Sequence, residues 1–159
     1  MPSRRVANEE LAERLGRSPD WIFQRSGIRF RHVVEPGTTS GDLAVAVGRE
    51  ALSRAAVGDV AAVVVATTTP DRPCPGTAPS VASRLAMTGA AALDVQAVCA
   101  GFVYGLGVAQ GLIAAGTADS VLVVGTDTLS LNVDPADPTS MLFGDGAGAV
   151  VLRAGRDDE

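Results

Sequence analysis

Lysine is absent from this sequence of 159 residues, and all 13 of its basic side chains are arginine. A guanidinium stays protonated in proteins and forms no Schiff base. Enzyme mechanisms that depend on a lysine nucleophile or a lysine base are therefore excluded for this chain.

Cysteine and histidine are scarce. The two cysteines, Cys74 and Cys99, lack the spacing of a CxxC motif, and His32 is the single histidine. This supply supports neither a disulfide framework nor a cysteine metal site. We expect no metal and no cofactor.

Long hydrophobic runs are also missing. None approaches the roughly 20 apolar residues that span a membrane, and the first five residues lead into no apolar segment. The net charge of -5 argues against general nucleic-acid binding, although the seven arginines in the first 31 residues suit a phosphate-bearing ligand. We expect a cytoplasmic protein with neither a membrane nor a nucleic acid as partner.

What the sequence does contain is the pattern of an α/β domain. Its composition, 47% hydrophobic and 19% charged, is that of a folded protein with a core. Apolar runs at 60–66 and 92–98 are typical of buried parallel strands, and 39–56 repeats at helical spacing. Residues 100–118 carry no charge, which predicts a helix buried nearly all round. The other predicted elements are helices at 8–16 (capped by Asn8), 18–28 and 77–87, strands at 120–125 and 147–152, and a tight turn at 144–148.

The glycine content of the uncharged helix adds one further prediction. The uncharged helix contains Gly101, Gly105, Gly107 and Gly111, each of which costs a helix about 1 kcal/mol relative to alanine. Such a cost predicts that a neighbouring backbone approaches this helix closely.

Cys99 is the most telling residue, because it lies where the apolar run at 93–98 meets the uncharged helix. A thiol at a strand-to-helix junction lies at the positive end of the helix dipole, which favours the reactive thiolate. The alternative is a buried structural cysteine, since free cysteine mostly behaves as a small hydrophobe.

Four segments in order resemble the β-ketoacyl-acyl-carrier-protein synthase III family, condensing enzymes of the thiolase-like fold. They are the nucleophile segment 94–102 (DVQAVCAGF), the early segment 21–29 (WIFQRSGIR), the strand 63–69 (VVVATTT) and the Gly-rich segment 143–149 (FGDGAGA). The resemblance covers residues 8 to 154. It implies the first half of a duplicated α/β/α/β/α arrangement, and a homodimer.

The resemblance also implies the chemistry. Cys99 would take the acyl group of an acyl-CoA as a thioester, and malonyl-acyl-carrier protein would lose CO2 and attack that thioester, starting fatty-acid or polyketide synthesis. Trp21 and Arg25 match positions at the CoA entrance; their alternatives are a half-buried anchor and a solvated charge. Phe143 and Gly144 would lie near the substrate. Cys74 falls in a loop that shapes the partner's acyl pocket in the family, although a cysteine in a proline-rich loop is more often incidental.

The sequence departs from the family pattern at three places. Family members are about twice as long, and their second half supplies the catalytic histidine and asparagine, so this chain alone is not expected to condense. The family's first strand is expected at the centre of the sheet, and residues 1–7 contain no comparable apolar run, which predicts a gap there. Pro138 stands where many relatives carry an arginine that contacts CoA phosphate.

Three functions follow from these observations. The leading one is a condensing enzyme represented by its nucleophile-bearing half, as a fragment, a truncated product or one part of a split enzyme. The second is a noncatalytic partner that pairs with a full-length relative through the 93–98 strand. The third is a thiolase-fold acyltransferase that passes the acyl group to a hydroxyl or an amine.

Overall fold

The computed structural model describes residues 1–155, and the chain divides into two compact units. Unit 1 comprises Met1–Thr39 and Thr128–Gly146, and unit 2 comprises Ser40–Asp127 and Ala147–Glu159. Each unit has its own hydrophobic core.

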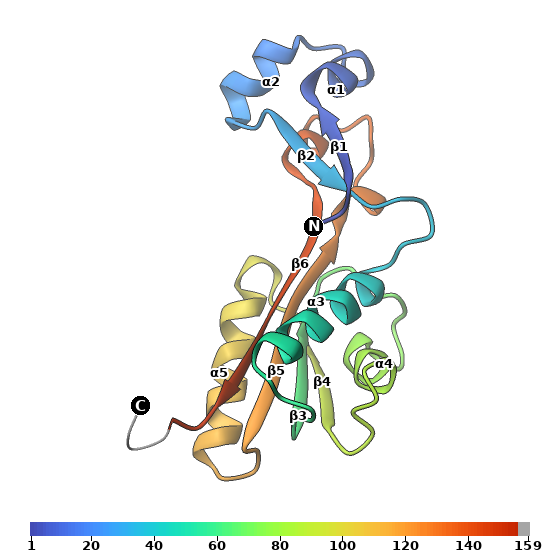
Figure 1. Cartoon of the computed structure of the whole chain (residues 1–159). Helices are drawn as coiled ribbons and strands as arrows, with labels where there is room; N and C mark the ends of the chain where they lie inside the picture. The colour runs from blue at the N-terminus through green and yellow to red at the C-terminus, as the bar shows by residue number, and fades with distance from the viewer. Residues whose placement is uncertain (156–159) are drawn as a thin grey trace. The chain divides into compact units, whose positions relative to one another are not determined.

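Unit 2 is built on a four-stranded sheet in the order β4-β3-β5-β6 (Figure 1). The strands are β3 (Ala62–Ala66), β4 (Ala91–Val95), β5 (Ser120–Thr128) and β6 (Asp145–Arg153). β3 is parallel to both of its neighbours, with Val64 opposite Leu93 of β4 and Val123 of β5. All five residues of β3 are buried, as expected of a strand covered on both faces.

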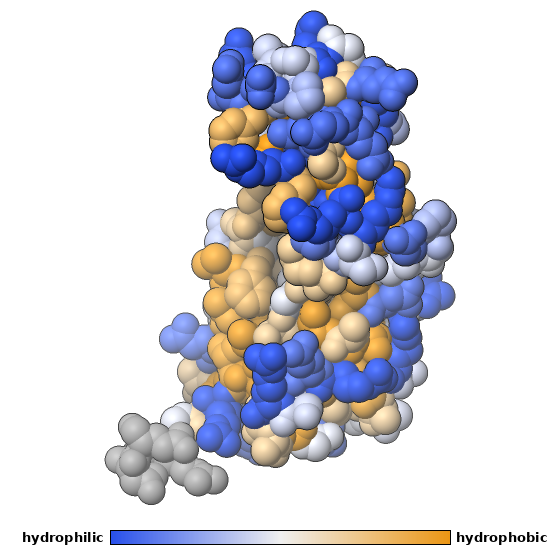
Figure 2. Space-filling model, turned by 45° about the horizontal axis from the view of Figure 1, so that its top comes forward, coloured by the Kyte–Doolittle hydropathy of each residue, from blue (hydrophilic) through white to orange (hydrophobic). Residues whose placement is uncertain are grey.

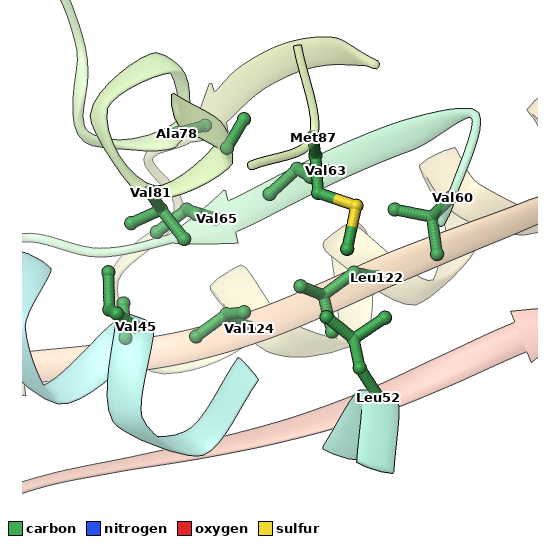
Figure 3. Close-up of a cluster of buried hydrophobic side chains, with 12 residues drawn as sticks. Val45, Leu52, Val60, Val63, Val65, Ala78, Val81, Met87, Leu122 and Val124 are labelled. Atoms are coloured by element: carbon green, nitrogen blue, oxygen red, sulfur yellow. The ribbon is translucent and has the colours of Figure 1, made fainter. Parts of the chain in front are cut away.

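Helices cover both faces of this sheet. α3 (Ser40–Arg54) and α4 (Thr77–Arg84) pack on one face, and α5 (Gly101–Ala114) packs on the other. Because successive strand residues point to opposite faces, Val63 and Val65 face α3 and α4 (Figure 3), whereas Val64 faces α5. The predicted α/β class is confirmed, and unit 2 consists of three layers: α3 and α4, the sheet, and α5.

Unit 1 is a small assembly of short elements. β1 (Arg4–Ala7) and β2 (Phe30–Val33) form an antiparallel ribbon. Along the chain, α1 (Asn8–Leu15) and α2 (Pro19–Ser26) connect these two strands. The later segment contributes the 3-10 turns η2 (Leu129–Leu131) and η3 (Pro138–Leu142). The two strands, the two helices and η3 each contribute one buried side chain to a single apolar cluster: Val6, Leu11, Ile22, Val33 and Met141.

The ends of the two helices follow from their sequences. Gly16 and Gly27 end α1 and α2 in the left-handed conformation that glycine adopts without strain. The Ser18 hydroxyl accepts a hydrogen bond from the backbone N–H of Trp21 at 3.1 Å and caps α2. Asn8, predicted as the cap of α1, is instead the first helical residue, and its buried side chain donates to the carbonyl of Ile28 at 2.7 Å.

Three further predictions are corrected by the structure. No gap lies at the centre of the described sheet, because β3 pairs directly with β5. The opening residues do contain a strand, β1, but it pairs with β2 in unit 1, and its single buried side chain, Val6, made it unrecognisable as an apolar run. Residues 145–148 belong to strand β6 and do not form a tight turn.

The uncharged helix is also less buried than predicted. Gly101, Gly105 and Ala109 of α5 are buried against the sheet, but the side chains of Val103 and Tyr104 are 64% and 59% exposed. Figure 2 shows apolar side chains gathered on the surface over α5. One face of this apolar helix is therefore uncovered within the described part of the chain.

Candidate active site

Cys99 lies on the turn that joins the sheet to α5. The 3-10 turn η1 (Val98–Ala100) follows β4 and runs directly into α5 at Gly101, and the N–H of Ala100 donates to the carbonyl of Ala97 at 3.0 Å. The Cys99 side chain is exposed and forms no disulfide within the described residues, so it is not the buried structural cysteine of the alternative interpretation. The predicted strand-to-helix junction is confirmed.

The residue before the cysteine has an unusual backbone. Val98 has φ of 49°, in the left-handed region that β-branched residues rarely enter, and its side chain is 72% exposed. Strained residues of this kind persist where the surrounding structure determines the conformation, and they cluster at functional sites. This conformation turns the chain from the end of β4 toward α5.

Two glycines let α5 lie close to the strands. A Cβ atom on Gly101 would be 3.3 Å from Cβ of Ala66, and one on Gly105 would be 3.2 Å from Cγ1 of Val123. The helix does lie close to the sheet at these two positions, but the nearest atoms are side chains of β3 and β5 and not the neighbouring backbone that was predicted. At Gly107 and Gly111 no other described atom lies within 4 Å of such a Cβ, so the prediction was wrong there.

A polar cluster that the sequence reasoning missed follows strand β3. Oδ1 of Asp127 accepts hydrogen bonds from the N–H of Thr68 at 2.7 Å, from the Thr68 hydroxyl at 2.9 Å and from the Thr69 hydroxyl at 3.1 Å. The N–H of Thr67 donates to the carbonyl of Val95 at 3.3 Å, which ties this segment to the end of β4. The carboxyl ends of parallel strands are the usual place for ligand sites in α/β sheets, and Cys99 follows β4 at that end.

Asp94 on β4 holds the start of α4. Its two carboxylate oxygens accept from the N–H groups of Thr77 and Ala78, each at 2.6 Å, which neutralises the positive helix end. A Cβ atom on Gly76 would collide with this carboxylate, so only glycine fits before the helix. The loop that ends at this cap carries Cys74, whose side chain is exposed.

The predicted CoA-entrance residues lie on α2 in unit 1. Trp21 is half-buried against the unit 1 core, and Arg25 is exposed. The guanidinium carbons of Arg25 and Arg17 lie 5.7 and 5.3 Å from the centroid of the Trp21 ring. These are cation–π contacts, so a flat aromatic surface and two cations are presented together.

Phe143 and Gly144 precede β6 and also lie in unit 1. Phe143 is half-buried, and a Cβ atom on Gly144 would lie 2.9 Å from the carbonyl oxygen of His32. Glycine is therefore required at 144 because the backbone of β2 passes it. The next residue, Asp145, is buried and accepts from the N–H groups of Val34 and Ser130, each at 2.8 Å, and from the Ser130 hydroxyl at 2.5 Å.

His32 makes a structural hydrogen bond, and the described residues show neither a metal-ligand cluster nor a membrane-spanning helix. Nδ1 of His32 lies 2.6 Å from the carbonyl oxygen of Pro2, to which it donates, as a structural histidine would. Within residues 1–155, His, Cys, Asp and Glu side chains form no group of three that could hold a metal ion. Among the same residues no helix combines the length and the apolar character needed to cross a membrane.

Comparisons with known proteins agree with the resemblance in the sequence. The family model of 3-oxoacyl-[acyl-carrier-protein] synthase III matches residues 93–159. The chain is 53% identical to β-ketoacyl-[acyl-carrier-protein] synthase III 3 of Streptomyces coelicolor, over 100% of this chain and 48% of that protein. The chain spans about half the length of the curated relatives it matches.

Solved structures agree as well. The crystal structure of 3-oxoacyl-(acyl carrier protein) synthase III from Pseudomonas aeruginosa PAO1 matches with a TM-score of 0.95 and 51% identity, over 100% of this chain and 49% of that one. The priming β-ketosynthase of the R1128 polyketide pathway matches with a TM-score of 0.93 and 37% identity, over 97% of this chain and 47% of that one. The thiolase-like fold is thus shared with both.

Proposed function

We propose that this chain is the N-terminal half of a β-ketoacyl-acyl-carrier-protein synthase III and that it carries the family's acyl-accepting nucleophile, Cys99. The observation that carries the proposal is the position of an exposed thiol on the η1 turn, between the carboxyl end of β4 and the start of α5.

The first half-reaction would be acylation of Cys99. Its sulfur attacks the thioester carbonyl carbon of an acyl-CoA, and the carbon–sulfur bond to CoA breaks. CoA leaves as its thiol with the proton that Cys99 gives up, and the acyl group remains on Sγ as a new thioester. The N–H of Cys99 is proposed as one donor to the oxyanion that forms on the way. Trp21 would stack on the adenine of CoA, and Arg25 would meet its phosphate. Pro138 offers no cation to that phosphate, so Arg25 of α2 would carry this contact.

The second half-reaction would be a decarboxylative condensation. Malonyl-acyl-carrier protein loses CO2, the resulting enolate carbon forms a bond to the acyl carbonyl carbon, and Cys99 leaves as thiolate, releasing a β-ketoacyl product. The one histidine of this sequence is His32, which is held by Pro2 in unit 1. We therefore propose that a second half supplies the histidine and asparagine that stabilise the enolate, and that residues 1–159 alone do not condense.

Assembly is proposed to use the edge of the sheet. β4 is the terminal strand in the order β4-β3-β5-β6, so within residues 1–155 its outer edge has no partner strand and would pair with a second copy. Cys74, exposed in the loop before α4, would then contribute to the partner's acyl pocket, while Phe143 and Gly144 would line the substrate path. The cytoplasmic location remains a prediction.

The acylation step can be tested on the full chain by intact mass spectrometry after incubation with acetyl-CoA or butyryl-CoA. We expect one acyl group per chain in the wild type and in Cys74→Ser, and none in Cys99→Ser. Failure of the wild type to gain an acyl group would favour the noncatalytic partner instead.

The condensation step needs a second experiment. The acylated chain is mixed with the separately expressed C-terminal half of the Streptomyces coelicolor relative and with malonyl-acyl-carrier protein. Release of CO2 and a β-ketoacyl product are expected with both halves and with neither alone. Transfer of the acyl group to a hydroxyl or amine acceptor without CO2 release would identify an acyltransferase.

A further inference from the structure

Unit 1 contains a cavity of about 290 Å³ that is lined entirely by residues of that unit. Its wall is largely apolar and includes Val6, Pro36, Leu131 and Phe143. Three arginines, Arg4, Arg14 and Arg31, also line it, with Glu10 as the single acidic lining residue.

Arg31 is the unusual member of this lining, because its side chain is buried without a counterion. The residue is 6% exposed, NH1 donates to Oδ1 of Asn8 at 2.7 Å, and NH2 donates to the carbonyl of Met141 at 2.5 Å. Both acceptors are neutral. The third nitrogen, Nε, is buried without a hydrogen-bond partner among the described residues. A buried charge of this kind is costly unless it is paired.

The charges around the cavity do not cancel. Arg4 and Glu10 form an ion pair at 2.6 Å, so they neutralise each other. In the described part of the chain, no ion pair joins a carboxylate to Arg14 or Arg31. Burial, together with the nearby positive charge of Arg14, lowers the pKa of Arg31 from its ordinary value. The cavity therefore has an excess of two positive charges beside an apolar wall.

We propose that this cavity binds a small organic anion, whose carboxylate or phosphate head pairs with Arg14 and Arg31 and whose short apolar body lies against Leu131 and Phe143. A charged oxygen in the cavity would provide the counterion that Arg31 lacks, and charge-assisted bonds to guanidinium are the strong ones. An apolar pocket with a few placed polar groups is the usual form of a small-molecule site. The site does not include Cys99, but it shares Phe143 with the proposed substrate path.

Binding can be measured on the full chain by isothermal titration calorimetry at constant ionic strength, with sodium butyrate, inorganic phosphate and butan-1-ol as separate probes. Butyrate tests head and body together, phosphate tests the head alone, and butan-1-ol has the same apolar body without charge. We expect butyrate to bind and butan-1-ol not to bind; binding of phosphate as tight as butyrate would show that the head alone is recognised.

Two variants with the same change in charge provide the control. Arg14→Gln removes an exposed cation of the cavity, and Arg49→Gln removes an exposed cation of unit 2. We expect Arg14→Gln to weaken butyrate binding by about tenfold and Arg49→Gln to leave it unchanged. The Nε–Hε resonance of Arg31, followed by NMR, should shift on addition of butyrate in the wild type.

Two results would overturn the proposal. One is no response to butyrate or phosphate in either method, which would leave a protein carboxylate as the partner of Arg31. The other is equal binding by both variants. Cys99→Ser should bind butyrate as the wild type does, so loss of acylation and loss of anion binding are separate outcomes.

Discussion

The two units of the molecule are stabilised in different ways. The centre of unit 2 is apolar: Val63, Val64 and Val65 of β3 are fully buried, with valine and leucine side chains of β5 beside them. In unit 1 the buried groups include an arginine and a carboxylate: Arg31, whose side chain donates two hydrogen bonds, and Asp145, whose side chain accepts three.

The two units therefore depend on different features of the sequence. An apolar core depends on the pattern of hydrophobic residues, which recurs along the chain and tolerates exchanges of similar size. A core of buried polar groups depends on particular donors meeting particular acceptors, and each unmet group is costly. We therefore expect unit 1 to be most sensitive to loss of a polar group and unit 2 to gain of one.

The largest expected effect is that of Asp145→Ala in unit 1. It removes the acceptor for two backbone N–H groups and a hydroxyl, and it should lower the free energy of unfolding by about 3 kcal/mol. Fluorescence of Trp21, the single tryptophan, reports unfolding of this unit in urea. Asp134→Ala, which loses one exposed hydrogen bond to the N–H of Ala136, is the control and should cost far less. Equal losses of unfolding free energy in Asp145→Ala and Asp134→Ala would show that unit 1 does not depend on its buried polar groups.

The next effect is that of Val64→Thr in unit 2. It keeps the side-chain shape but introduces a hydroxyl at a position with 0% exposure, and we expect a loss of about 2 kcal/mol, measured by circular dichroism during urea unfolding. Val103→Thr, on the uncovered face of α5, makes the same exchange where water reaches the side chain. It should change stability by less than about 0.5 kcal/mol. A harmless Val64→Thr would show that the core of unit 2 tolerates polar groups.

A smaller effect distinguishes the two faces of α5. Gly107→Ala adds a methyl group in open space and should stabilise the helix by about 1 kcal/mol. Gly105→Ala offers the same gain, but its methyl group lies 3.2 Å from Cγ1 of Val123, so crowding should offset that gain. We expect Gly105→Ala to be about 2 kcal/mol less stable than Gly107→Ala in thermal unfolding. Equal stabilities would mean that α5 does not need glycine at 105.

The smallest effect concerns an exposed cap in unit 1. Hydrogen bonds from the Thr139 side chain and then its backbone N–H lower the pKa of Asp137. Because the folded-state pKa is lowered, this contribution is present above the ordinary pKa of aspartate and is lost as the pH falls through the lowered value. Thr139→Val should raise the pKa of Asp137 toward its ordinary value, as followed by carboxyl NMR, whereas Thr139→Ser should not. An unchanged pKa in Thr139→Val would assign the shift to the backbone alone.

The contrast also explains what the sequence could predict. The strands and helices of unit 2 follow hydrophobic periodicity, and β3, α3, α4 and the junction at Cys99 were all expected near their observed positions. Glycines lower the stability of a helix, so their presence in α5 indicated close packing, and the structure shows it against the sheet at Gly101 and Gly105.

The rest depends on pairings that periodicity does not encode. The ribbon of β1 and β2 has one or two inward side chains in each strand, so no apolar run marks it. Asp145 lies in a Gly-rich segment that resembles a turn, and its role is visible only once Val34 and Ser130 are brought beside it. The hydroxyl cluster on Asp127 likewise joins residues nearly 60 positions apart, and the threonine run after β3 was its only signal.

The most direct test of the account compares the two cysteines within one molecule, since both are exposed. The chain is treated in parallel with acetyl-CoA and with iodoacetamide, and the label on Cys99 relative to Cys74 is quantified by peptide mapping. We predict that the preference for Cys99 over Cys74 is at least about tenfold greater for the acetyl group than for the alkylating agent, because a thioester must be oriented as well as reached. The same ratio for both reagents would contradict it.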